Sequence, residues 1–135
     1  MSGYGEIVYL LKKYSTKQPQ EKWSTRSETQ YKKLMRLKEK IEIFDGINTE
    51  YYNLKGSQRE RAIYLIKHLE FKKICGQCSN EQIIVLICYF IKCEYVKGYG
   101  RKKCRRVFNE YNISDNLIDK FMVHLAHCGI NGGFS

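Results

Sequence analysis

The feature that most constrains this 135-residue chain is an unbroken run of nine apolar residues at 83–91, which reads Ile-Ile-Val-Leu-Ile-Cys-Tyr-Phe-Ile. A helix that crosses a bilayer needs about 17 apolar residues or more, and this shorter run is flanked by Glu81 and Lys92. A helix that is apolar on every side must be enclosed by other helices. We therefore expect a central buried helix at 79–96 and no membrane span.

A strand is the alternative interpretation of this run, because Ile and Val are common on pleated sheets. Ser79 precedes the run, however, and Gln82 stands three residues later, which is the spacing of a helix capping box. No other segment shows the alternation of polar and apolar residues that a partner strand would need. The sequence therefore predicts an all-α fold, a single domain of five to six helices packed around the central one.

Two longer amphipathic segments precede the central helix. Residues 27–44 start with a serine followed three residues later by glutamine, again a capping box, and Asp45-Gly46 should end that helix. Residues 57–74 repeat the pattern, and Ser57 is the expected cap. Both segments place apolar side chains at helical spacing, so each should pack one face against the central helix.

The domain boundaries follow from these helices. We place the helical core domain at 27–129 and a C-terminal tail at 130–135. An N-terminal arm and a flexible connection occupy 1–26, with a short docking helix at 6–14. We expect Trp23 to be pinned onto the domain, and contact with a partner is the alternative. The start of the chain lacks the basic leader of a secretory signal, and six Cys are fewer than in secreted disulfide scaffolds, which predicts an intracellular protein.

Two short helices, at 101–111 and 114–127, should close the domain, and a serine caps the second. Their lengths and their short connection have the proportions of a helix-turn-helix motif. In that motif the first residues of the second helix read base edges. Here those residues include Asp115 and Asp119, which phosphates would repel, and only Asn116 suits a base edge. The pattern favours contact with a phosphate backbone over sequence reading.

The net charge of +10 is concentrated in two places. Residues 97–111 carry six bases and one acid, which is half of the excess. Such a segment attracts phosphate or an acidic protein surface, and a merely solvated basic face is the alternative. The expected contact residues are Lys97, Arg101, Lys102, Lys103, Arg105, Arg106 and Asn116. A second basic region lies in the N-terminal third, around Lys12, Lys13, Lys32 and Lys33.

The cysteines allow one metal site to be drawn. Cys75 and Cys78 have the spacing of a zinc knuckle, and His124 and Cys128 lie four residues apart, so together they could form a zinc site. We favour the alternative of free thiols, or of a disulfide from Cys75 or Cys78. The chain has no Gly-rich phosphate loop, no HExxH and no spaced carboxylate pair, so we predict no enzyme and no cofactor.

From residue 27 onward, five helices with the third buried and the last two short resemble the cyclin-type repeat of archaeal transcription factor B and its eukaryotic relatives. Residues 79–95 and 101–126 carry this resemblance. It implies a DNA-binding protein that regulates transcription through phosphate or RNA polymerase contacts. The abundant Ile, Lys, Tyr and Asn and the scarce Ala indicate an AT-rich coding sequence, which fits a thermophilic archaeon or its virus among many other sources.

The chain is also similar to small basic helical proteins of archaeal viruses, which include virion components and inhibitors of host RNA polymerase. This similarity implies a virion protein, or a host-targeting viral protein of the host cytoplasm that binds an acidic partner. The partner predicted from the sequence is therefore nucleic acid or an acidic protein surface such as RNA polymerase. The sequence neither predicts nor excludes a homo-oligomer.

Overall fold

The computed structural model describes residues 25–130, and this part of the chain contains helices and no strand. Its α-helices are α2 (Thr25–Ile47), α3 (Ser57–His68), α4 (Phe71–Ile74), α5 (Asn80–Tyr95), α6 (Arg105–Glu110) and α7 (Asp115–His127). A π-helical turn, Asn48–Tyr52, continues α2, and a 3₁₀ turn, Arg101–Cys104, leads into α6. The prediction of an all-α single domain is confirmed. The predicted arm helix at 6–14 and Trp23 lie outside the described residues.

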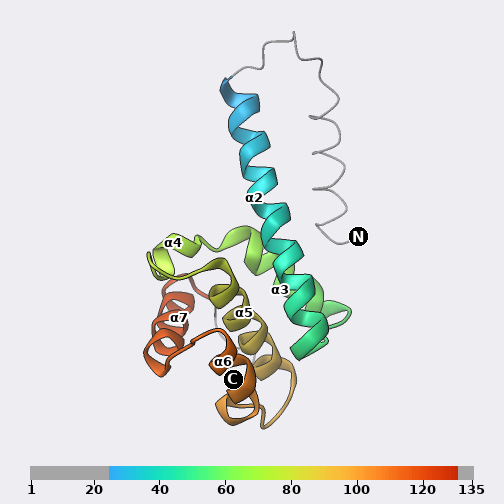
Figure 1. Cartoon of the computed structure of the whole chain (residues 1–135), viewed down its shortest axis with the longest axis vertical. Helices are drawn as coiled ribbons and strands as arrows, with labels where there is room; N and C mark the ends of the chain where they lie inside the picture. The colour runs from blue at the N-terminus through green and yellow to red at the C-terminus, as the bar shows by residue number, and fades with distance from the viewer. Residues whose placement is uncertain (1–24, 131–135) are drawn as a thin grey trace.

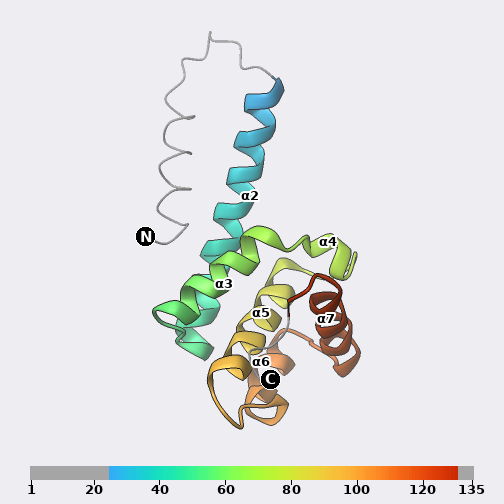
Figure 2. The ribbon, with the colours of Figure 1, turned by 180° about the vertical axis from the view of Figure 1, so that it is seen from behind.

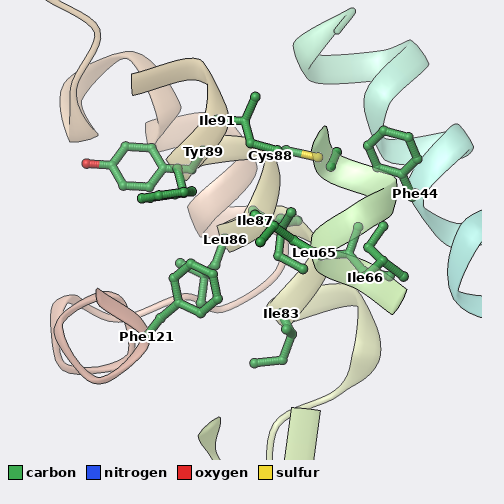
Figure 3. Packing of buried hydrophobic residues seen from close by; sticks show 14 of the residues in the cluster. Phe44, Leu65, Ile66, Ile83, Leu86, Ile87, Cys88, Tyr89, Ile91 and Phe121 are labelled. Carbon is green, nitrogen blue, oxygen red and sulfur yellow. The ribbon is translucent and has the colours of Figure 1, made fainter. Parts of the chain in front are cut away.

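The central helix is α5, as the apolar run predicts. Every residue of the run is at most 6% exposed. Figures 1 and 2 show α5 between α2 and α3 on one side and α7 on the other, and its most extensive contacts are with α2 and α3. In Figure 3, side chains of α5 meet Phe44 from α2, Leu65 and Ile66 from α3, and Phe121 from α7. The helix is enclosed because it has no polar face to expose.

The predicted start of α5 is confirmed in detail. The Ser79 hydroxyl accepts a hydrogen bond from the Gln82 backbone N–H at 3.2 Å, and the Gln82 side-chain oxygen accepts one from the Ser79 N–H at 3.1 Å. The Gln82 amide nitrogen also donates to the carbonyls of Tyr111 and Asn112. The capping box therefore joins the start of the central helix to the end of α6.

The first long helix extends beyond its predicted end at Asp45-Gly46. It runs to Ile47 and into the π-helical turn, because Ile47, Asn48 and Tyr52 are all buried. The helical turn ends at Asn53, whose left-handed backbone (φ 53°) lets its N–H donate to the Asn48 carbonyl at 2.6 Å. Burial of the residues that follow Gly46 thus overrides the turn signal.

The predicted helix at 57–74 is wrong in two respects. Its cap is Gly56 (φ 58°), whose carbonyl accepts from the Glu60 N–H at 3.0 Å, and Ser57 makes no capping bond. The helix also breaks after His68, where Leu69 is extended, and resumes as α4. In a continuous helix Phe71 would lie about 200° from Leu69, on the opposite face. The break lets both side chains be buried, at 6% and 7% exposed.

The closing pair of helices forms as predicted, in shorter pieces. The expected helix at 101–111 is divided into the 3₁₀ turn and α6, and Cys104, Val107 and Phe108 are buried as expected. The Ser114 hydroxyl caps α7 by accepting from the Leu117 N–H at 3.2 Å. Across residues 25–130, none of the helices has the length and apolar character that a transmembrane helix requires.

Candidate functional site

Five of the predicted contact residues lie on one exposed segment, which we name the basic ridge. It comprises Lys97, Lys102, Lys103, Arg105 and Arg106. Lys97 lies in the loop after α5, the next two on the 3₁₀ turn, and the last two on α6. The opposite side of this segment is anchored in the core, where Phe108 packs edge-on against Tyr89 with ring centroids 5.3 Å apart. Packing of this side against the core thus leaves the face that carries the cations exposed to solvent.

The cations of the basic ridge have no ion-pair partner among residues 29–130. Lys102, Lys103, Arg105 and Arg106 are consecutive apart from the buried Cys104, so four positive charges fall within five positions of the chain. Such an arrangement costs electrostatic energy until a counter-charge binds. The basic ridge is therefore suited to an anionic partner.

Arg101 differs from its neighbours because it is already paired. One guanidinium nitrogen lies 2.7 Å from a carboxylate oxygen of Asp119, and another lies 3.1 Å from one of Asp115. The hydrogen bond to Asp119 is the main reason that the pKa of Arg101 is raised. The acidic first turns of α7, which conflict with a helix that reads DNA, are therefore partly neutralised by the turn that precedes α6.

Tyrosine rings support two cations of the basic ridge. The Lys103 ammonium lies 5.9 Å from the centre of the Tyr99 ring, and the Arg106 guanidinium lies 5.5 Å from that of Tyr51. Tyr51 in turn meets Tyr111 edge-on, with ring centroids 6.3 Å apart. These cation–π contacts restrict the side chains without neutralising them.

A hollow of about 460 Å³ lies between the basic ridge and the start of α7. Its charged and polar lining comes from Arg101, Lys102, Arg105, Asn109, Ser114 and Asp115. Guanidinium, ammonium and amide groups are the donors that bind phosphate oxygens. The hollow could therefore receive one phosphate group of a nucleic-acid backbone beside those on the exposed basic ridge.

Asn116, the single predicted base-reading residue, is exposed on α7 but lines a different hollow. That second hollow, of about 430 Å³, lies between α4 and α7 and is also lined by Lys73, Lys120, His124 and His127. The structure therefore brings Arg101, Lys102 and Arg105 to one hollow and leaves Asn116 outside it.

The four residues of the zinc site considered in the sequence do not come together in the structure. Among residues 25–130, no three His, Cys, Asp or Glu side chains are grouped so that they could hold a metal ion. Cys75 and Cys78 form one pair, and the Cys128 sulfur lies 3.5 Å from the His124 Nε2 to form another. The two pairs do not converge on one metal position. All six Cys are free thiols. Cys88 and Cys104 are buried in the core, and Cys75, Cys78, Cys93 and Cys128 lie outside it.

A second basic cluster was missed by sequence reasoning. Arg36 and Lys40 on α2 and Lys72 on α4 line one hollow of about 440 Å³, together with Glu39 and Glu70. Burial, followed by the charges of Arg36 and Lys72, lowers the pKa of Lys40, whose ammonium lies 4.2 Å from the centre of the Phe71 ring. The cluster depends on the break before α4, which the sequence did not signal.

Comparisons with protein-family models, with curated proteins and with solved structures found no match for this chain. The chemistry of the side chains is therefore the basis for a functional argument. The basic ridge offers hydrogen-bond donors and positive charge, because the side chains of Lys and Arg have no acceptor.

Proposed function

We propose that this protein binds nucleic acid through the phosphate backbone and regulates transcription. One observation carries the proposal: five exposed cations are grouped on one anchored segment with no ion-pair partner among the described residues. Neutralising phosphates by such a group releases counterions from the nucleic acid, which supplies most of the free energy of non-specific binding. The resemblance to the transcription factor B repeat makes transcription the setting that we propose.

The arrangement favours backbone contact over base reading. The cations of the basic ridge precede α7 in the chain, whereas the first turns of α7, where a recognition helix would read bases, carry Asp115 and Asp119. A carboxylate only accepts hydrogen bonds, and both of these are already paired with Arg101, so the first turns of α7 offer few donors to a groove. Contacts to phosphate position a protein on a duplex but carry no sequence information. We therefore expect tight binding at low salt with little preference among sequences.

A second candidate function is that of a virion or host-targeting protein that binds an acidic protein surface, such as one on RNA polymerase. The exposed carboxylates of Asp115 and Asp119 beside the basic ridge favour it. A protein partner can place cations opposite these carboxylates as well as carboxylates opposite the basic ridge, whereas a polyanion repels the acidic part.

The proposal is tested by fluorescence anisotropy of labelled duplex DNA and duplex RNA at low salt. We expect wild-type protein to bind both, and Arg105→Ala/Arg106→Ala to bind at least about tenfold more weakly, since each lost phosphate contact removes counterion release. The matched control is Arg36→Ala/Lys72→Ala, which removes the same charge from the other basic cluster and should bind as wild type does.

Two results would overturn the proposal. One is no detectable binding of wild-type protein to either nucleic acid at low salt. The other is equal loss of affinity in the ridge variant and in the α2–α4 control, which would mean that only net charge matters. In the first case, recovery of RNA polymerase from a nuclease-treated host lysate by wild type, and not by the ridge variant, would support the acidic-protein candidate instead.

A further inference from the structure

A pair of thiols lies apart from the basic ridge, in the turn between α4 and α5. Cys75 and Cys78 are both half-exposed and free. The Cys78 N–H donates to the Cys75 carbonyl at 3.3 Å, which closes a four-residue turn. In such a turn the first and last Cα atoms lie less than about 7 Å apart. A disulfide needs about 4.4 to 6.8 Å, so the backbone already holds the two residues within bonding range.

The two thiols are not equivalent. The pKa of Cys75 is lowered, chiefly by a hydrogen bond with the Cys78 side chain and then by the backbone of Gln77 in the same turn. The positive charge of Lys120 on α7 acts in the same direction. Burial, followed by the bond to Cys75, raises the pKa of Cys78 to about 11. Cys75 is thus the nucleophile of the pair, and Cys78 is the proton-bearing partner.

We propose that Cys75 and Cys78 form a thiol–disulfide exchange site that takes a disulfide of an alkyl thiol as its substrate. The Cys75 thiolate attacks one sulfur of the substrate, forming a mixed disulfide and releasing one thiolate. Cys78 then loses its proton to solvent and attacks the Cys75 sulfur, which releases the second thiolate. The chain is oxidised to a Cys75–Cys78 disulfide, and the substrate is reduced to two thiols.

The order of attack follows from the surroundings. Thiolate is the reactive form, and Cys75 carries more of it than Cys78 at neutral pH. Nucleophilicity falls as the pKa falls, with a Brønsted coefficient of about 0.4 to 0.5, so part of this advantage is lost. Because this loss is only partial, Cys75 keeps a net rate advantage over Cys78.

Oxidised glutathione serves as the probe on the full chain. The reduced protein is incubated with it, quenched by alkylation and digested, and the peptide masses are measured. In wild type we expect the peptide that holds both residues to lose two hydrogens and to carry no glutathione. In Cys78→Ser, glutathione should stay attached to Cys75. In Cys75→Ser, glutathione should become attached to Cys78 more slowly than it becomes attached to Cys75 in Cys78→Ser.

The exposed Cys128 is the internal control within each sample. Since it has no neighbouring thiol among the described residues, it should form a mixed disulfide that does not resolve. The inference is overturned if wild type keeps free thiols or glutathione at Cys75 while Cys128 reacts, or if Cys78 reacts as fast in Cys75→Ser as Cys75 does in Cys78→Ser. The wild-type result decides even if a variant fails to fold.

Discussion

Arg101 and Asp119 join the two closing helices through a 2.7 Å ion pair, and the same guanidinium reaches Asp115 at 3.1 Å. All three side chains are well exposed, so the pairs contribute less than about 1 kcal/mol to the stability of the fold. Their larger effect is electrostatic, because they reduce the negative potential of α7 beside the basic ridge.

The first prediction concerns this arrangement. Arg101→Ala should weaken nucleic-acid binding more than Lys102→Ala, because it removes one cation and also frees two carboxylates next to the bound phosphates. Melting temperature should change little. The affinities are measured by anisotropy at one fixed salt concentration.

The triple variant Arg101→Ala/Asp115→Asn/Asp119→Asn separates two roles of the arginine. If Arg101 acts by neutralising the carboxylates, the triple variant should recover most of the lost affinity. If the triple variant binds as weakly as Arg101→Ala, the guanidinium contacts phosphate directly and its pairing with α7 is incidental.

The second prediction separates stability from binding within α6. Phe108 is 6% exposed and packs against Tyr89, so Phe108→Ala should lower the free energy of unfolding by about 3 to 5 kcal/mol. Arg105→Ala/Arg106→Ala should cost less than about 1 kcal/mol, including the lost contact of Arg106 with Tyr51. Urea unfolding measures both. A ridge variant as unstable as Phe108→Ala would contradict the view that these arginines serve a partner.

The third prediction concerns the capping box of α5. Ser79→Ala removes one bond to the Gln82 N–H and should cost about 1 kcal/mol. Gln82→Ala removes its bond to the Ser79 N–H and also its bonds to the carbonyls of Tyr111 and Asn112, so it should cost more. Ser114→Ala, a cap without a reciprocal partner, is the control for a simple cap. Equal losses of stability in Ser79→Ala and Gln82→Ala would mean that the bonds from Gln82 to the carbonyls of Tyr111 and Asn112 do not stabilise the fold.

The fourth prediction concerns alkaline pH. Burial is the largest cause that raises the pKa of Tyr52 and of Tyr99, and both hydroxyls hydrogen-bond with the Cys104 thiol. Burial likewise raises the pKa of Tyr89 to about 12. A group with a raised folded-state pKa contributes stability below its unfolded pKa and loses that contribution as pH rises toward the folded value.

Stability should therefore fall steadily above about pH 10, where tyrosines of the unfolded chain ionise. Ultraviolet difference absorbance should show a subset of tyrosines that ionise only as the helical circular dichroism disappears. Tyr52→Phe should flatten the loss above pH 10. A full tyrosine titration completed before any unfolding would contradict the buried thiol–phenol cluster.

Particular residues explain how far the sequence predicted this fold. The apolar run at 83–91 and the serines at 79 and 114 act locally, through burial and through side-chain bonds three residues away, and both helices start where they predict. The break at Leu69 has no local signal, because neither Gly nor Pro is present. It depends on burying Phe71 in a core that only the folded chain provides.

The candidate site divides in the same way. The cations of the basic ridge are neighbours in sequence, so their grouping could be predicted. The ion pairs of Arg101 with Asp115 and Asp119 cross 14 and 18 positions, and the Arg36, Lys40 and Lys72 cluster joins α2 to α4. Such long-range pairs depend on how the helices pack, and local spacing does not encode them.

The salt dependence of duplex binding tests the central claim most directly. The logarithm of the binding constant is plotted against the logarithm of salt concentration for wild type, for Arg105→Ala/Arg106→Ala, and for Arg36→Ala/Lys72→Ala. Each phosphate contact on duplex DNA contributes about 0.9 to the slope, so the ridge variant should have a slope shallower by about 1.8. The α2–α4 control should keep the wild-type slope. A ridge variant with the wild-type slope would contradict the assignment of the basic ridge as the nucleic-acid interface.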